Sequence, residues 1–394
     1  MKCLFCGNED LSLIRKTEIF NREIFKTEYK KDIHKELLNI YICNHCGYGF
    51  YDNQFDEETI EEYYKNFEYT NPFDGLSISS WFDRNLSVIK NKLNKDAMIV
   101  EIGCSDGFFM NKLQSAGYTN IMGIEASEHA KKGIERGFNI KNIFFTEETI
   151  KEYSLFEKSS VDAFVLLHTF EHFLNPFVIF ETMCMYLKDT GFIFIETPNF
   201  SSFALGHISY FSWFFYEKMA EKYNMKIVEV IDDNENITVV FTKKNNNQYK
   251  ELSCPYSINQ LKERVKNNIN SKELFYNNII EEIKNAVCKS NKVLIWGTKI
   301  VAANIVSAIP DIENLVGKEL DAMGGGKVII PVDSYKSRKG YILKNITKPT
   351  VCPEDIKDSY YDTVIVTTEF INEVKKTMHE YNITCNNIIH AVNV

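Results

Sequence analysis

The stretch that decides the fold of this chain is Val100-Glu101-Ile102-Gly103-Cys104-Ser105-Asp106-Gly107-Phe108. It follows an apolar run and places two glycines four residues apart, with Glu101 two residues before the first glycine. This spacing differs from Gly-x-Gly-x-x-Gly, whose middle glycine admits the pyrophosphate of a dinucleotide. The acidic residues Glu101 and Asp106 instead favour a ligand that lacks phosphates and carries a positively charged amino-acid group.

A further acidic residue, Glu125, ends the next predicted strand, 22 residues after Gly103. A carboxylate in this place can accept hydrogen bonds from two ribose hydroxyls. The ordered set of glycines and acids therefore predicts S-adenosylmethionine, rather than a dinucleotide, as the cofactor. Cys104 is interpreted as a small side chain that fills space in the loop, not as a nucleophile. The residues predicted to bind the cofactor are Glu101, Gly103, Cys104, Asp106, Gly107, Glu125, Ala126 and His168.

The residues on both sides of this stretch predict an α/β fold. From residue 97 onward, short apolar runs alternate with helical patterns of about 10–15 residues, which is typical of a parallel, doubly wound sheet. Two later runs, 226–231 and 237–242, are joined by a polar turn and predict a hairpin at one end of that sheet. The other predicted strands are 98–102, 121–125, 142–145, 162–167 and 192–196, and helices are predicted at 55–64 and 81–93.

A polar segment, Asn245-Asn246-Asn247-Gln248, marks a domain boundary. Beyond it, Ser257 and Gln260 have the spacing of a capping box, and apolar residues follow at helical spacing. We therefore expect helices that pack against the neighbouring domains.

The last hundred residues predict a second, smaller Rossmann-like domain. A strand-turn-helix unit begins at 292–297. Its turn contains one glycine, Gly297, whereas a dinucleotide-binding motif needs three. Redox chemistry with a nicotinamide is therefore not expected. Asp333 lies at a predicted strand end, where it could contact a ribose, and the glycines at 324–326 predict a flexible turn. Later strands are predicted at 328–332 and 362–367.

Two Cys-x-x-Cys pairs, Cys3/Cys6 and Cys43/Cys46, lie near the start of the chain. Zinc prefers four thiolates in a tetrahedron, and two short knuckles of this spacing supply them. Such a closed ligand set predicts a structural zinc ion, with His45 as a substitute ligand that fits less well than Cys46. The alternatives are four free thiols or a redox pair. The other six cysteines are scattered, so a disulfide framework is not expected.

The composition excludes several classes of protein. With 45 basic and 54 acidic residues the formal charge is −9, which argues against a nucleic-acid-binding protein. The sequence shows no secretory signal, and its longest uncharged stretch, 197–216, contains proline, asparagine, glycine and serines that make it a poor membrane span. Uncharged backbone of this kind more often lines a pocket. We therefore expect a cytoplasmic protein whose partner is a small molecule.

Residues 97–244 resemble the class I S-adenosylmethionine-dependent methyltransferases. The whole chain resembles the three-domain, zinc-containing nucleotide-sugar C-methyltransferases. This resemblance implies a zinc-ribbon module at 1–55, a Rossmann-like methyltransferase domain at 56–245, a helical linker at 246–290, and a smaller Rossmann-like domain at 291–394 that helps to bind the nucleotide-sugar. The motifs that carry it are Glu101-x-Gly103-x-x-x-Gly107, Gly123-Ile124-Glu125 and His168-Thr169-Phe170-Glu171-His172-Phe173-x-x-Pro176.

The same resemblance bears on the reaction. After the fifth strand the C-methyltransferases carry Tyr-His-Glu-His, and His207 matches the last histidine, which is the family's proposed base. The tyrosine and glutamate positions are Ala204 and Gly206 in this sequence. Carbon methylation needs a proton removed beside a ketone and polar groups that hold the enolate. A hydroxyl acceptor needs only one well-placed base, so the sequence favours oxygen methylation.

The residues predicted to be catalytic are His207, Tyr210, Glu171 and His172. Tyr210 could either donate to the acceptor or pack, and Glu171 with His172 could form an acid/base pair. We predict methyl transfer from S-adenosylmethionine to a hydroxyl of a small, sugar-containing or nucleotide-linked metabolite. The alternatives are C-methylation of a nucleotide-linked keto-sugar and a non-catalytic zinc-ribbon adaptor that only binds the cofactor. Retention of Glu101, Asp106 and Glu125 argues against the adaptor.

Overall fold

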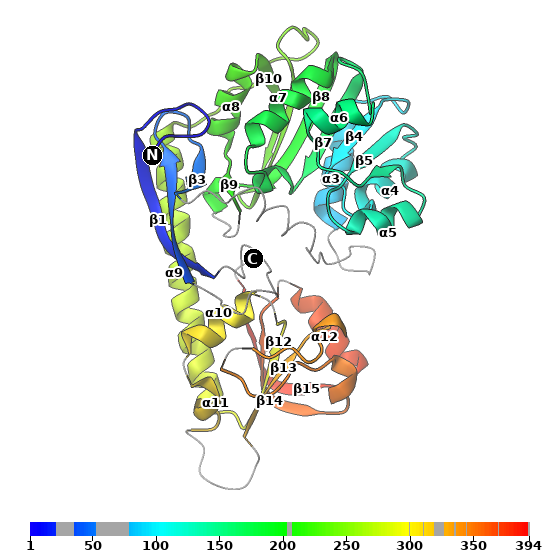
Figure 1. The fold of residues 1–394 in the computed structure, drawn as a ribbon. Helices are drawn as coiled ribbons and strands as arrows, with labels where there is room; N and C mark the ends of the chain where they lie inside the picture. Colours follow the sequence, from blue (N-terminus) through cyan, green and yellow to red (C-terminus); the bar gives the residue numbers. More distant parts are fainter. Residues whose placement is uncertain are drawn as a thin grey trace. The chain divides into compact units, whose positions relative to one another are not determined.

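The protein forms two compact units, Met1–Asn268 and Ile269–Val394, in a computed structural model (Figure 1). The predicted helix at 55–64, Ala204, Gly206 and the glycines at 324–326 lie outside the residues that the structure describes. So does the boundary predicted at residue 55. The described residues are 1–20, 35–52, 79–202, 207–298, 300–309, 311–318, 327–334, 336–343, 345–368 and 370–392.

A seven-stranded sheet forms the centre of the first unit, in the order β10-β11-β8-β7-β4-β5-β6. The five strands from β8 to β6 are parallel, whereas β11 runs antiparallel to β8 and β10 antiparallel to β11. The predicted doubly wound sheet and its terminal hairpin are therefore confirmed. The strands are β4 (Ile99–Ile102), β5 (Ile121–Ile124), β6 (Ile140–Lys141), β7 (Val161–Leu167), β8 (Leu187–Pro198), β10 (Met225–Asp232) and β11 (Asn236–Lys243).

The prediction of a strand at 142–145 is wrong. The paired segment is the preceding β6, and Asn142 already leaves the sheet because its side-chain amide donates to the backbone oxygens of Glu125 and Ser127. The chain then enters a capping box at Thr146, which starts the helix α6 (Glu147–Glu152). Apolar residues alone therefore misplaced this strand by two residues.

Helices cover both faces of the sheet, and the strands alternate between two cores. Ile99, Ala163 and Val165 pack with α3 (Ser79–Lys90), α4 (Phe108–Ser115) and α5 (His129–Glu135). Val100 and Phe164 pack instead with α6, α7 (Pro176–Tyr186) and α8 (Trp213–Lys222). Successive residues of a strand point to opposite faces, so these continuous apolar runs fill both layers.

The N-terminal residues form a second sheet in the same unit, in the order β1-β2-β3-β9. Its strands β1 (Leu11–Phe20), β2 (Lys35–Cys43) and β3 (Gly49–Tyr51) are joined by β9 (Ser209–Tyr210), which comes from the middle of the chain. The Tyr48 hydroxyl lies 2.6 Å from Ser209 Oγ, and the Tyr51 hydroxyl lies 2.8 Å from that of Tyr210. The cysteine knuckles are thus packed against the residues that follow His207.

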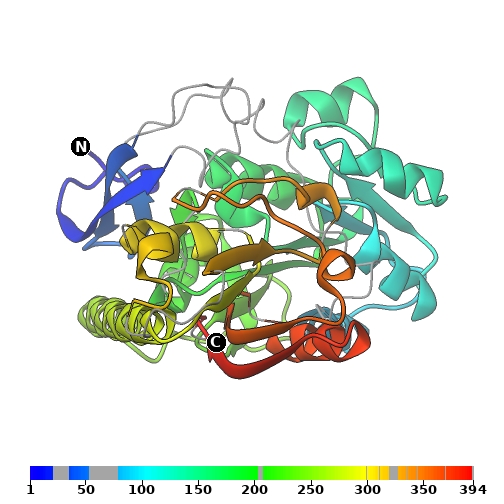
Figure 2. The ribbon, with the colours of Figure 1, turned by 90° about the horizontal axis from the view of Figure 1, so that it is seen from below.

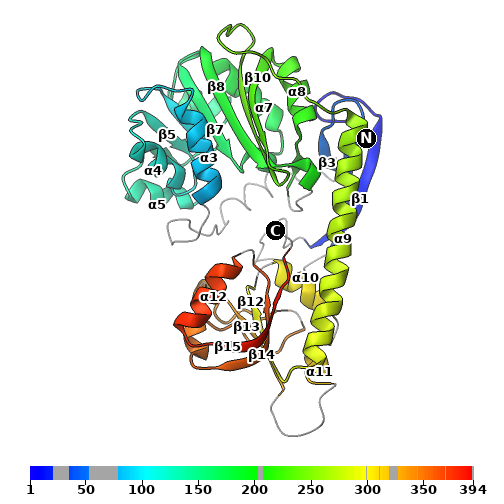
Figure 3. The same ribbon diagram turned by 180° about the vertical axis from the view of Figure 1, so that it is seen from behind.

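One helix, α9 (Ile258–Cys288), runs across the boundary between the two units (Figure 3). Ser257 and Gln260 form the predicted capping box at its start, with the Gln260 amide donating to Ser257 Oγ. In the first unit, Lys262 Nζ donates to Ser12 Oγ at 3.0 Å and to Asn44 Oδ1 at 2.9 Å. Its later residues, including Ile283, pack in the core of the second unit.

The second unit has a four-stranded, all-parallel sheet in the order β13-β12-β14-β15 (Figure 2). Its strands are β12 (Lys292–Trp296), β13 (Val328–Val332), β14 (Tyr360–Val366) and β15 (Thr384–His390), and its helices include α10 (Ile300–Ala308), α11 (Ile312–Leu315) and α12 (Ile371–Glu380). The sequence did not predict β15, because only its end is apolar. Within the described part of the chain, every helix is too short or too polar to cross a bilayer.

Candidate functional site

The loop between β4 and α4 makes a tight turn at the carboxyl end of the sheet. Gly103 and Gly107 have φ angles of 75° and 85°, a left-handed conformation that side chains disfavour. A Cβ atom on Gly103 would lie 2.3 Å from Thr169 Oγ1, so the segment after β7 also leaves no room for one. The predicted glycines therefore allow the loop to contact the residues that follow β7.

Glu125 holds this loop to the next one. Its two carboxylate oxygens accept hydrogen bonds from the backbone amides of Ser105 and Ser127, both at 2.8 Å. Ala126 lies between the acceptor Glu125 and the donor Ser127, and it is half-buried. Glu125, Ala126 and the glycine loop are thus brought together as the sequence predicted.

Two further carboxylates are buried at the same place. Glu101 is 4% exposed, and among the described residues its Oε2 atom has no hydrogen-bond partner. Burial raises the pKa of Glu101, and the negative charges of Glu125 and Asp106 raise it further. Asp106 pairs with Arg136 Nη1 at 2.6 Å, but within the described chain its Oδ1 atom accepts no hydrogen bond. The site is therefore short of positive charge, as the binding of a cationic ligand requires.

Cys104 is buried beside these acids. A Cβ atom on Gly123 would lie 2.5 Å from its sulfur, so the side chain fills the space over β5. Burial, together with the charges of Glu101 and Glu125, raises the pKa of the Cys104 thiol well above its usual range. A thiol that stays protonated is a poor nucleophile, which agrees with the interpretation of Cys104 as a filler.

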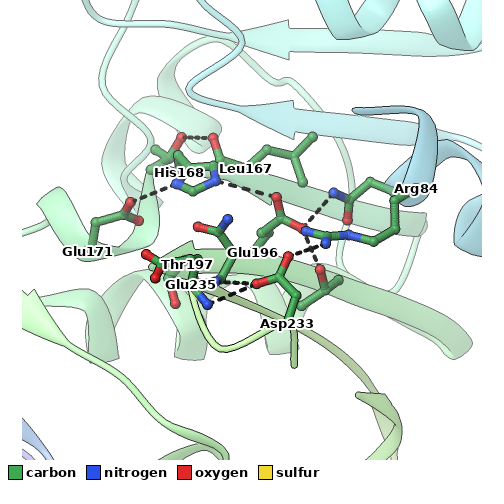
Figure 4. A network of polar contacts seen from close by, with 12 residues as sticks. Arg84, Leu167, His168, Glu171, Glu196, Thr197, Asp233 and Glu235 are labelled. Atoms are coloured by element: carbon green, nitrogen blue, oxygen red, sulfur yellow. Dashed lines mark hydrogen bonds and ion pairs between the residues drawn. The ribbon is translucent and has the colours of Figure 1, made fainter. Parts of the chain in front are cut away.

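His168 lies between two buried glutamates (Figure 4). Its Nδ1 atom is 3.6 Å from Glu171 Oε1 and its Nε2 atom is 3.4 Å from Glu196 Oε1. Burial alone would lower the pKa of His168, but the interactions with the two carboxylates raise it to about 9. His168 is therefore positively charged at neutral pH, and its φ of 53° shows that the backbone turns sharply here.

Glu196 and its partners form a further network that no sequence motif predicts. Glu196 Oε2 accepts hydrogen bonds from Arg84 at 2.8 Å, from Asn85 at 2.7 Å and from Thr238. Burial would raise the pKa of Glu196, but the bond from His168 and these donors lower it to about 2. The sequence feature that could have indicated this network is the glutamate at the end of the apolar run 192–196.

A second cluster contains Glu171, His172 and His207. The imidazole rings of His172 and His207 lie 5.1 Å apart, and the Ile208 amide donates to the Glu171 backbone oxygen at 3.1 Å. This bond fixes the residue after His207 to the short helix η2 (Phe170–His172). Burial lowers the pKa of His172 to about 4, so this imidazole is neutral at physiological pH. Three of the four predicted catalytic residues are thus brought together.

Tyr210, the fourth predicted catalytic residue, lies in β9. It is 4% exposed, its ring packs 5.3 Å from that of Phe200, and its hydroxyl bonds that of Tyr51. Burial raises the pKa of Tyr210 well above its usual range. These contacts join β9 to β3, and a role of Tyr210 toward an acceptor stays a prediction.

Residues 77–230 match the family model described as "Methyltransferase domain". The chain therefore contains a methyltransferase domain, and it is an enzyme. The prediction made for residues 97–244 is confirmed at this level. A comparison with curated proteins found no significant match.

The methyltransferase domain is also similar to solved structures. One is a methyltransferase dependent on S-adenosylmethionine from Aquifex aeolicus, with 16% identity, a TM-score of 0.36, and coverage of 48% of this chain and 98% of that chain. Another is such an enzyme from Archaeoglobus fulgidus, with 15% identity, a TM-score of 0.33, and coverage of 41% and 93%. A third is from Mesorhizobium loti, with 12% identity, a TM-score of 0.33, and coverage of 41% and 99%.

The buried charges around Glu196 yield a prediction on stability. Glu196→Gln would leave His168 and Arg84 without their shared carboxylate, and breaking a buried ion pair from one side is costly. We expect the free energy of unfolding to fall by about 2–4 kcal/mol, less than for a fully buried pair, because Arg84 and His168 are 24% and 28% exposed. Urea unfolding measures this change.

The matched control for Glu196→Gln is Asp189→Asn. Asp189 pairs with Lys243 at the surface and is 72% exposed, so its loss should change the free energy of unfolding by less than about 1 kcal/mol. Equal effects of the two substitutions would contradict the structural role of the buried network.

Proposed function

We propose that this methyltransferase transfers a methyl group from S-adenosylmethionine to a hydroxyl oxygen of a small, sugar-containing or nucleotide-linked metabolite. The observation that carries the proposal is that one segment, 168–172, reaches both halves of the site. Thr169 adjoins Gly103 in the cofactor loop, while Glu171 and His172 lie beside His207. An acceptor bound near His207 would therefore lie next to the cofactor.

The residues around the glycine loop fit the cofactor. When bound, S-adenosylmethionine supplies an electrophilic methyl carbon on a positively charged sulfur. Glu101 and Asp106 each keep a buried carboxylate oxygen without a partner in the described chain, and they would attract the cationic groups of the ligand. The Glu125 carboxylate would bind the ribose hydroxyls. His168 would border the same site from the far side of the loop.

His207 would take the proton of the acceptor, with Glu171 and His172 beside it. Most of the acceleration would come from holding the acceptor oxygen in line with the methyl group, at about 3 Å. In the second unit, Asp333 accepts hydrogen bonds from Thr298 and pairs with Arg338 at 2.8 Å.

The four cysteines would hold a structural zinc ion. Cys3 Sγ lies 3.6 Å from Cys46 Sγ, and Cys6 Sγ lies 3.6 Å from Cys43 Sγ. Zn–S bonds of about 2.3 Å in a tetrahedron separate the sulfurs by about 3.8 Å, which is close to the observed spacing. His45, the substitute ligand, is exposed and lies outside this group of four.

A first prediction concerns cofactor binding. Glu125→Ala removes the proposed ribose ligand, and loss of a hydrogen bond to a charged group costs roughly 1.5–3 kcal/mol. Calorimetry with S-adenosylhomocysteine should therefore show affinity lower by about one to two orders of magnitude. Glu128→Ala, three residues later and exposed, should leave the affinity unchanged. Unchanged affinity of Glu125→Ala, or tight NAD binding by the wild-type protein, would refute the assignment.

A second prediction concerns the chemistry. Once mass spectrometry of retained small molecules has identified an acceptor, His207→Asn should slow its methylation by roughly 10²–10⁴-fold while leaving S-adenosylhomocysteine affinity intact. The exposed His379 provides the control, because His379→Asn should keep the full rate. A lower melting temperature with an unchanged rate would instead assign His207 a structural role.

Solvent exchange distinguishes the atom that is methylated. Deuterium that enters a carbon position of the acceptor, in the absence of S-adenosylmethionine, would support the alternative of C-methylation. Its absence is expected for a hydroxyl acceptor. A cofactor that binds but is never turned over would support the non-catalytic adaptor.

A third prediction concerns the metal. Protein purified without chelator should contain one zinc ion bound by the cysteines, and Cys43→Ser should lose that equivalent in elemental analysis. Binding of a structural zinc ion to its cysteine ligands contributes directly to the free energy of folding. The same variant should therefore have a lower melting temperature. Cys385→Ser, outside the cluster, should keep its zinc. Equal zinc contents of the two variants would contradict a site at the four cysteines.

A further inference from the structure

We propose that Glu171, His172 and His207 bind a divalent first-row transition metal ion, separate from the ion held by the cysteines. One potential ligand atom from each of the three side chains lies within 4.8 Å of the other two. Two imidazole nitrogens and one carboxylate oxygen form a ligand set that zinc, iron and cobalt accept. Three protein ligands leave coordination positions open, as a catalytic ion requires.

The burial of the three side chains fits such a site. Glu171 is 1% exposed, and neither of its carboxylate oxygens has a hydrogen-bond partner among the described residues. Its charge is offset in part by His168, whose Nδ1 atom lies 3.6 Å from Oε1. A buried carboxylate that accepts no hydrogen bond is costly even beside one cation, and a bound metal ion would stabilise it further. His172, in contrast, is 31% exposed, so the site is open to solvent on this side.

The backbone already holds the ligands close together. Glu171 and His172 are adjacent in η2, and the bond from the Ile208 amide to the Glu171 backbone oxygen fixes the residue next to His207. Metal–nitrogen bonds of about 2.1 Å place tetrahedral ligand atoms about 3.4 Å apart. The three ligand atoms therefore need to move about 1 Å closer to one another. Rotation of the partly exposed His172 imidazole allows this movement.

This inference rests on the proposed function for its chemical meaning. The hydroxyl of the acceptor would occupy an open position, and the ion would lower its pKa so that the proton leaves to solvent water. The oxygen then forms a bond to the methyl carbon, the bond from that carbon to sulfur breaks, and its electron pair returns to sulfur as S-adenosylhomocysteine forms. With the ion bound, His207 would act as a ligand and the ion would promote the proton loss, whereas without the ion His207 would take the proton itself, as proposed above.

Cobalt is the probe that tests the site. The full chain, with one zinc at the cysteines, is titrated with Co²⁺ and followed by its visible absorption and by elemental analysis. We expect one Co²⁺ per chain without thiolate-to-metal charge-transfer bands, because the ligands are nitrogen and oxygen. Glu171→Gln and His172→Asn should each weaken Co²⁺ binding at least tenfold, while His379→Asn leaves it unchanged.

Absence of Co²⁺ uptake would overturn the proposal, as would thiolate bands as the sole signal or equal affinity in all variants. Circular dichroism shows whether the two variants fold, and either of them, if folded, is sufficient for the test. Calorimetry with S-adenosylhomocysteine, without added metal, tests the cofactor site separately. Intact Co²⁺ binding with no cofactor binding would refute the proposed function and support the metal site.

Discussion

The pairing of β3 with β9 is the contact on which the arrangement of the first unit depends. Two short strands, 160 residues apart in the chain, form one edge of a sheet, and their tyrosines bond across it. Tyr48 is fully buried, and its ring lies 5.1–5.2 Å from those of Phe177 and Phe215. The cysteine knuckles are therefore packed against the methyltransferase core itself. The strand that follows the second knuckle thus pairs with β9, which begins two residues after His207.

Charge is distributed unevenly around the site. Near the glycine loop three carboxylates lie close together, and Arg136 pairs with one of them, Asp106. Beyond β7 and β8, the positive charges of His168 and Arg84 offset Glu171 and Glu196. The first region favours a cationic ligand, whereas the second is internally balanced and rigid. The segment 168–172 belongs to both regions, so the two halves of the site share one piece of backbone.

Much of the fold could be predicted from the sequence, because buried parallel strands are continuous apolar runs. The capping box at Ser257 and the two cysteine pairs were also recognisable, since their chemistry depends on short spacings. In contrast, β15 contains Asn386 and Asn387 and is largely exposed, so apolar content did not reveal it. Glu196 and Arg84 are 112 residues apart, and their contact depends on the order of the strands and helices in space. Local patterns carry no information of that kind.

The continuity of α9 has a consequence for how the protein unfolds. A helix of 31 residues extends about 46 Å, and apolar side chains near both of its ends are buried, each set in a different unit. Unfolding of either unit would remove the packing that orders its half of the helix. The fraying of that half would then weaken the other half, because helix formation is cooperative. The two units are therefore coupled through the helix, and after a cut near residue 268 each half would be ordered only by the packing within its own unit.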